Sequence, residues 1–252
     1  MSATSCSIST LNNKAISLVQ KGESRNAFKL FLQALSQLKF EVRSQKKATY
    51  SSGTEPSNAG SPFIRVTLSK MEHEQSGDSA TDSSFAVFDQ LVALNPKVDS
   101  CAPQQRDGTT AALLYNMALS YQHMSQSRHC EMTSKSCLHL KKAASTFAMA
   151  FSASQHWKRW TKTHIGCSVL ELAILNNLIG LHSQMGSADK VKQLQACYCK
   201  SLGAASRELS QEEKSFFVAN LERSPAVVSR ANTSQHTKQP ATENSQTQTA
   251  AA

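Results

Sequence analysis

The sequence predicts an all-α protein, in which helices form three pairs followed by one terminal helix. Two observations lead to this fold class. An asparagine stands nine residues before a turn-forming residue three times, at Asn13, Asn116 and Asn177. Two of the helices expected after these turns share an Ala-x3-Phe-x2-Ala pattern, which places the three residues on one helix face. The same short unit therefore recurs along the chain.

The first pair is expected over residues 11–43, after a flexible N-terminus at 1–10. Each helix has an apolar face, and a glycine marks the turn between the two helices. The positions that define the pair are Leu11, Ala15, Leu18, Gly22, Ala27, Phe31 and Ala34.

Residues 44–108 are expected to form a polar insert. Two short apolar runs, 63–68 and 85–94, lie in it on either side of a polar stretch. They fit the two strands of a β-hairpin, with Pro62 and Pro96 as outer stops. The second run fits a short helix almost as well, so both alternatives stand.

The second pair is expected over 109–154, with an internal loop at 126–137, and the third over 168–206. The second pair carries the same apolar positions as the first, at Leu114, Ala118, Tyr121, Ala143, Phe147 and Ala150. The third pair matches at its first helix and turn, and its second helix has Val191, Gln195 and Tyr198 at the places of the repeated pattern.

A terminal helix over 210–221 is expected to pack Phe216, Phe217 and Leu221 on the last pair. The final residues, 222–252, are rich in Ser, Thr, Asn and Gln and contain no aromatic residue. Such a composition cannot bury a core, so this stretch is expected to be a disordered tail.

These positions resemble the tetratricopeptide-like repeat family, in which a Leu is followed by a small residue, a large apolar residue, a turn glycine and Ala-x3-Phe-x2-Ala. The irregular spacing of the units resembles tetratricopeptide-like proteins of single-celled algae. The resemblance implies a solenoid of helix pairs whose first helices line a concave groove. It further implies an adaptor that binds a peptide or a partner helix of another protein in that groove.

On the geometry of that family, the groove would be lined by polar side chains that offer both hydrogen-bond donors and acceptors. The groove residues expected here are Asn12, Gln20, Tyr115, Gln122, His123, Asn176 and Gln184. Asn13, Asn116 and Asn177 lie one residue further round each helix, where we expect them to form hydrogen bonds within the helix stack.

The chain is basic, with 27 Lys and Arg against 18 Asp and Glu, a net charge of +9. The first 47 residues are the most basic block, because they hold eight of the Lys and Arg and only two acids, Glu23 and Glu41. A solvated helix face explains this block, and so does an acidic partner such as a nucleic acid or an acidic peptide. The alternative function is therefore a basic, RNA-associated helical repeat, which we disfavour because no stripe alternates basic and aromatic residues.

A short aromatic and basic cluster, Trp157, Lys158, Arg159 and Trp160, lies in an expected connector at 155–167. Two indole rings beside two cations are suited to stacking on a base or on an acidic peptide. They are equally suited to covering the joint between two helix pairs, and this second interpretation is the one we favour.

The sequence contains no phosphate-binding glycine loop, no His-Glu-x-x-His and no Gly-x-Ser-x-Gly, so we expect no enzyme and no cofactor. His129, Cys130, Cys137 and His139 are close enough in sequence to suggest zinc ligands. The six residues between the two cysteines exceed the usual spacing, so a loop without metal is the preferred interpretation.

No run of 18 apolar residues occurs, and residues 1–10 lack the basic and apolar regions of a signal peptide. The seven cysteines show no framework spacing, which is typical of free thiols in a reducing compartment. We expect a cytoplasmic protein without a membrane span, and a nuclear location is left open.

Overall fold

The computed structural model describes residues 7–48, 63–67, 86–96, 103–126, 134–160 and 165–223. The helices in these ranges are α1 (Ile8–Gln20), α2 (Ser24–Ala48), α3 (Pro103–Gln126), α4 (Ser134–Trp160), α5 (Ile165–Gln184), α6 (Ala188–Ala205) and α7 (Gln211–Glu222). The strands are β1 (Phe63–Thr67) and β2 (Gln90–Leu94). The prediction of a mainly helical chain is confirmed, with one small sheet added to it.

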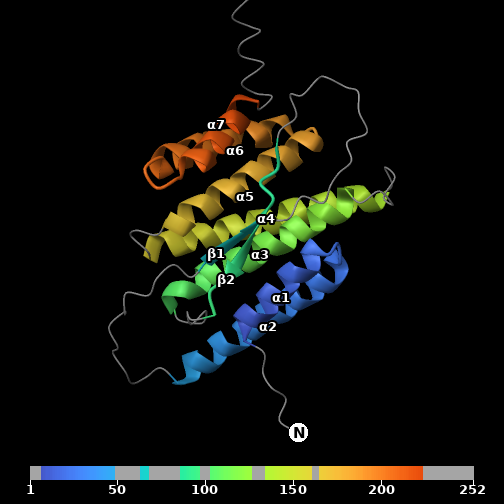
Figure 1. Cartoon of the computed structure of the whole chain (residues 1–252), viewed down its shortest axis with the longest axis vertical. Coiled ribbons are helices and arrows are strands. Elements are labelled where there is room, and N and C mark those ends of the chain that lie inside the picture. Colours follow the sequence, from blue (N-terminus) through green and yellow to red (C-terminus); the bar gives the residue numbers. More distant parts are fainter. Residues whose placement is uncertain are drawn as a thin grey trace, which may run out of the picture.

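The helices stack along the long axis of the molecule in the order of the sequence (Figure 1). α1 packs on α2, α3 on α4, and α5 on α6, while contacts of α2 with α3 and of α4 with α5 join one pair to the next. α7 packs on α5 and α6 and closes the end of the stack opposite to α1 and α2 (Figure 1).

The second helix of each pair buries the face that the repeated pattern predicts. On α2 and α4 all six residues of that pattern have no exposed surface: Ala27, Phe31, Ala34, Ala143, Phe147 and Ala150. On α6 the equivalent residues Val191, Gln195 and Tyr198 are buried as well. Alanine lets neighbouring helices approach, and each buried Phe contributes about 1.5–3 kcal/mol of hydrophobic stabilisation.

Caps and turns set where the helices begin and end. α1 starts at Ile8 because the hydroxyl of Ser7 accepts the backbone N–H of Thr10 at 3.2 Å. The expectation of a flexible 1–10 is therefore wrong for residues 7–10. Gly22 and Gly186, which follow α1 and α5, have φ of 78° and 69°, a conformation that glycine adopts without a steric cost.

Several helices extend beyond the bounds expected for them, and α3 and α5 begin early, at Pro103 and Ile165. α2 continues through residues 44–48, which were assigned to the insert, and α4 continues through 155–160, which were assigned to the connector. Neither stretch contains Gly or Pro, and Lys, Gln and Arg favour helix, so nothing in these residues stops it. α4 also starts at Ser134, inside the expected loop 126–137.

β1 and β2 pair antiparallel, with Phe63 opposite Leu94 and Thr67 opposite Gln90. Of the two alternatives for the run 85–94, the strand is the one observed, over Gln90–Leu94. Residues 86–89 lead into β2, and we call residues 86–94 the inner segment. It runs across the stack of helices (Figure 1), and β2 contacts both α1 and α3.

Residues 103–108 were also expected in the insert, but they form the start of α3, whose first residue Pro103 stands where a helix tolerates proline. Outside the described residues lie 49–62, 68–85 and 97–102 of the expected insert, 127–133 of the expected loop, 161–164 of the expected connector and the tail after residue 223. Among the helices that are described, none is both long enough and apolar enough to cross a membrane.

Candidate functional site

Six asparagines from four helices surround the inner segment. We call them the asparagine ladder: Asn12 and Asn13 on α1, Asn116 on α3, Asn176 and Asn177 on α5, and Asn220 on α7. Five are 0–1% exposed, and Asn13 is half-buried. A buried carboxamide costs free energy unless it is hydrogen-bonded, so the partners of these side chains explain why they are tolerated here.

Four ladder side chains each bind both backbone groups of one residue in the inner segment. The carboxamide oxygen accepts the N–H of that residue, and the carboxamide nitrogen donates to its C=O, as a neighbouring strand would. The pairs are Asn13 with Leu94, Asn116 with Val92, Asn177 with Phe88 and Asn220 with Ala86, at N···O distances of 2.8–3.1 Å.

The residue before a paired asparagine makes a second type of contact on three helices. Asn12, Tyr115 and Asn176 donate to the carbonyls of Val92, Phe88 and Ala86, at 3.1, 3.0 and 3.0 Å. In the series α1, α3, α5 and α7, each of these carbonyls also accepts from the ladder residue of the following helix, so both of its lone pairs are used. A single segment residue is thereby bound by two helices that follow one another in this series.

Hydrogen bonds between ladder side chains fix the orientation of the carboxamides. Asn116 donates to the oxygen of Asn12 at 3.0 Å, and Asn220 donates to the oxygen of Asn176 at 2.9 Å. Because each oxygen that accepts must face the donor, the amide groups cannot be flipped without losing these bonds. The ladder thus consists of two groups of three hydrogen-bonded asparagines inside the helix stack, one on α1 and α3 and one on α5 and α7.

The two ends of the inner segment have different surroundings. Leu91, Val92, Ala93 and Leu94 are buried in β2, whose other edge pairs with β1. Phe88 instead lies in an aromatic cluster on α7, with its ring centroid 5.4 Å from that of Phe216 and 5.2 Å from that of Phe217.

Two buried tyrosine hydroxyls belong to this environment. Burial raises the pKa of Tyr115 well above its ordinary value of 10.0, the negative charge of Asp89 raises it further, and a hydrogen bond with Asn177 lowers it. Burial, followed by Cys199, also raises the pKa of Tyr198, whose hydroxyl donates to the carbonyl of Phe217 at 2.9 Å. Both side chains therefore stay neutral donors over the physiological pH range.

Three of the seven predicted groove residues, Asn12, Tyr115 and Asn176, contact the inner segment, each at a different residue along it. The others, in the second halves of the first helices, differ in exposure: Gln122 is buried, Gln20 and His123 are half-buried, and Gln184 is exposed.

The expectation for Asn13, Asn116 and Asn177 is corrected. They were expected to bond within the helix stack, but their main partners are the backbone groups of the inner segment. The missed signal is the run 85–94 itself. A strand paired with a single neighbour leaves the N–H and C=O groups of its other edge without backbone partners, and buried side-chain amides can supply them.

The aromatic and basic cluster does not present all of its side chains to solvent. Trp157 has no exposed surface, which agrees with the alternative that it covers a joint between helices. Arg159 is exposed, and the side chain of Trp160 lies outside the described part of the chain.

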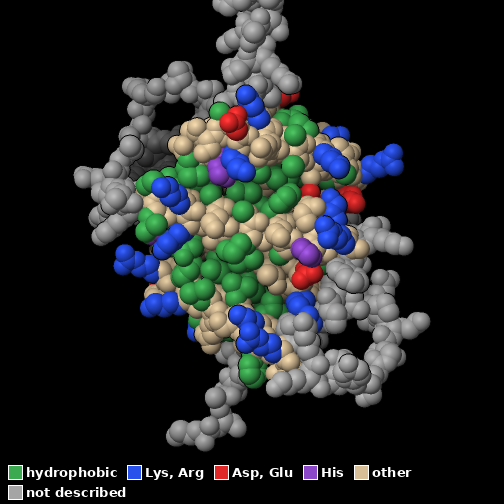
Figure 2. Space-filling model, turned by 180° about the vertical axis from the view of Figure 1, so that it is seen from behind, with side chains coloured by type: hydrophobic (Ala, Val, Ile, Leu, Met, Phe, Trp, Pro, Cys, Tyr) green, Lys and Arg blue, Asp and Glu red, His purple; other side chains and the backbone are tan. Residues whose placement is uncertain are grey.

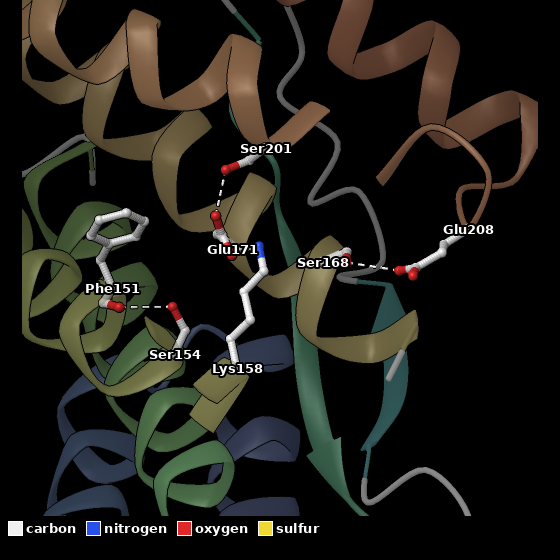
Figure 3. A network of polar contacts seen from close by, with 7 residues as sticks. All are labelled: Phe151, Ser154, Lys158, Ser168, Glu171, Ser201 and Glu208. Carbon is white, nitrogen blue, oxygen red and sulfur yellow. Dashed lines mark hydrogen bonds and ion pairs between the residues drawn. The ribbon is translucent and has the colours of Figure 1, made fainter. Parts of the chain in front are cut away.

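Lys158 from the same cluster forms an ion pair with Glu171 on α5, at 3.0 Å (Figure 3). Glu171 is only 2% exposed and also accepts from the hydroxyl of Ser201 on α6, so it ties three helices together. A second tie, from Ser168 to Glu208 at 2.7 Å, lies nearby (Figure 3).

The suggested zinc ligands find no support in the described residues, in which no group of three or more His, Cys, Asp or Glu is arranged to hold a metal. Cys137 is exposed and His139 is half-buried, while His129 and Cys130 lie outside the described ranges.

No protein-family model, no curated protein sequence and no solved structure matches this chain.

Proposed function

We propose that the chain is a tetratricopeptide-like solenoid that acts as a protein–protein interaction adaptor, and that its groove binds extended peptides through their backbone. The observation that carries the proposal is the asparagine ladder, which binds both the N–H and the C=O of four residues of the inner segment, at positions 86, 88, 92 and 94. These contacts do not depend on the side chains of the bound segment. Any extended peptide with the same register presents the same groups.

The repeat architecture is supported by the three helix pairs and their shared burial pattern. Each first helix carries ladder residues and each second helix carries a buried apolar face. Stacked helix pairs of this kind form an inner surface along which a partner segment lies.

In the proposed function, the inner segment is an occupant supplied by the chain itself. An intramolecular occupant acts at an effective concentration that reaches the millimolar range, so a partner peptide must compete with it. The adaptor would then bind only partners that match the groove better than residues 86–94, or partners that meet the protein when this segment has moved away.

The test weakens the inner segment and supplies it in trans. In the full chain, Phe88→Ser with Leu94→Ser removes two buried side chains but leaves every ladder residue in place. A fluorescein-labelled peptide with the sequence of residues 85–96 is then titrated against both proteins by fluorescence anisotropy. We expect the variant to bind it at least about tenfold more tightly than the unaltered chain, since the competitor is weakened.

A matched peptide controls for the recognition mode. N-methylation at the positions of Phe88 and Val92 removes two N–H donors without changing the side chains, so it should abolish binding. Circular dichroism establishes that the variant is still helical. A helical variant that does not bind the unmodified peptide, or that binds the methylated peptide equally well, overturns the proposal and makes the inner segment a fixed part of the fold.

A further inference from the structure

The outward face of α2 combines four cations with two large exposed apolar side chains. Leu32 is 44% exposed and Phe40 is 70% exposed. By helical periodicity they share one face with several basic side chains, and all of these are exposed. We call this surface the α2 face: Arg25, Lys29, Leu32, Lys39, Phe40 and Arg43.

Within the described residues, no other element covers the α2 face. α2 packs on α1 and α3 through the opposite side, where Ala27, Phe31, Ala34 and Leu38 are buried. The first pair also forms one end of the stack (Figure 1). End units of a solenoid normally present a polar surface to water. The exposed Leu32 and Phe40 depart from that rule.

The charge of this face is of one sign. Four cations surround the two apolar side chains, and the described part of the face carries no acid. Glu41 lies on another side of α2, where it accepts a hydrogen bond from Gln37 at 2.9 Å. The back of the molecule likewise shows a central hydrophobic area bordered by many Lys and Arg and few acidic side chains (Figure 2).

We propose that the α2 face is a docking site for an acidic amphipathic helix of a partner protein. Leu32 and Phe40 are separated by about 12 Å along the helix axis, at 1.5 Å per residue. Apolar anchors seven residues apart on a partner helix have nearly the same separation, about 10.5 Å, and lie on one face. Acidic residues on both sides of those anchors would then face the four cations. This site is independent of the groove and of its proposed function.

The experiment uses the full chain and a designed probe. The probe is a fluorescein-labelled helical peptide of roughly 18 residues, with Leu on one stripe and Glu on both sides. We expect micromolar binding by fluorescence anisotropy. Leu32→Ser with Phe40→Ser should weaken it at least about tenfold, and Lys29→Glu with Lys39→Glu should weaken it by a similar factor.

The matched control is Leu138→Ser with Met149→Ser on α4, which removes the other two exposed large hydrophobic side chains of the described structure. This variant should bind the acidic probe as the unaltered chain does. The proposal is overturned if the acidic probe does not bind, if a probe with Lys in place of Glu binds as well, or if the control variant loses binding equally. It is also overturned if analytical ultracentrifugation shows self-association that Leu32→Ser with Phe40→Ser abolishes, because a second copy is then the occupant. Tighter binding of single-stranded RNA than of the probe overturns it as well.

Discussion

The two halves of the inner segment are bound by the same type of contact but are held in different surroundings. Val92 and Leu94 are bound by the ladder residues of α3 and α1 on one edge, and their strand pairs with β1 on the other. Ala86 and Phe88 are bound by α7 and α5, and their side-chain contacts come from the aromatic cluster.

The comparison separates the contribution of the ladder hydrogen bonds to stability from the contribution of the groups packed around the inner segment. Hydrogen bonds to the backbone fix the path of the segment in both halves, but a buried hydrogen bond contributes only about 0.5–1.5 kcal/mol net. The larger share of stability comes from what is packed around it, namely a strand and aliphatic side chains in one half and aromatic rings in the other. We therefore expect residues 86–88 to separate from the helices before residues 91–94 do when the aromatic contacts around Phe88 are removed.

Phe88→Ala tests the aromatic half most directly. The substitution removes a buried ring that contacts Phe216 and Phe217, and we expect the free energy of unfolding to fall by about 3–5 kcal/mol. Urea denaturation followed by circular dichroism measures this loss. A loss below about 1 kcal/mol would show that the ladder alone holds this half of the segment.

Asn116→Ala and Asn220→Ala compare the two halves through their polar contacts. Each substitution removes three hydrogen bonds. We expect a loss of about 2–4 kcal/mol for Asn116→Ala, because the N–H of the buried Val92 is left without a partner, and about 1–2 kcal/mol for Asn220→Ala, because water reaches the half-buried Ala86.

Amide hydrogen exchange provides the local measurement for this pair of variants. Asn220→Ala should speed exchange at Ala86 and leave Val92 protected, whereas Asn116→Ala should speed exchange at Val92. Equal acceleration at both amides in both variants would mean that the inner segment opens as one unit.

The smallest effect concerns the two buried tyrosines, Tyr115 and Tyr198, which donate to the carbonyls of Phe88 and Phe217. The pKa values of Tyr115 and Tyr198 are raised above the ordinary value of 10.0, mainly by burial, so above pH 10 the unfolded chain loses protons that the folded chain keeps. The free energy of unfolding should then fall as pH rises, by up to about 1.4 kcal/mol per pH unit for each of the two tyrosines.

Tyr115→Phe separates the two tyrosines. The substitution should lower the free energy of unfolding by about 1 kcal/mol at neutral pH, since the Phe88 carbonyl keeps its hydrogen bond from Asn177. It should also remove the contribution of Tyr115 to the fall of this free energy at alkaline pH. Unfolding by urea between pH 8 and about pH 11 measures both. An unchanged slope in this variant would assign the alkaline loss to other groups.

Much of the helical fold could be predicted from the sequence because its signals are local. Ala27, Phe31 and Ala34 lie on one helix face by spacing alone, and Gly22 marks the turn before them. The helix ends at Ala48 and Trp160 were misplaced, because polar residues without Gly or Pro read equally well as loop or as exposed helix.

The candidate site was predicted only in part, since its main partner is distant in the sequence. Repeat geometry places Asn12, Tyr115 and Asn176 on the inner surface, but the identity of what they bind depends on contacts that span 80, 27 and 90 residues. For Asn13 and Asn177, nothing within their own helices distinguishes a bond to a neighbouring helix from a bond to an inserted strand. The periodicity of a helix predicts which side of the helix a side chain lies on, but it does not predict which segment of the chain packs against that side.

The contact between Ala86 and Asn220 spans 134 positions of the chain, which has a consequence for biosynthesis. A chain leaving the ribosome has made residues 86–94 long before α7 exists, so the contacts of Ala86 and Phe88 with α7 form only after α7 has been made. Until then this end of the segment lacks Asn220 and its aromatic neighbours. The newly made chain therefore passes through a stage in which helix pairs are formed while part of their inner surface is still incomplete, and that stage is when chaperones or a partner would find it accessible.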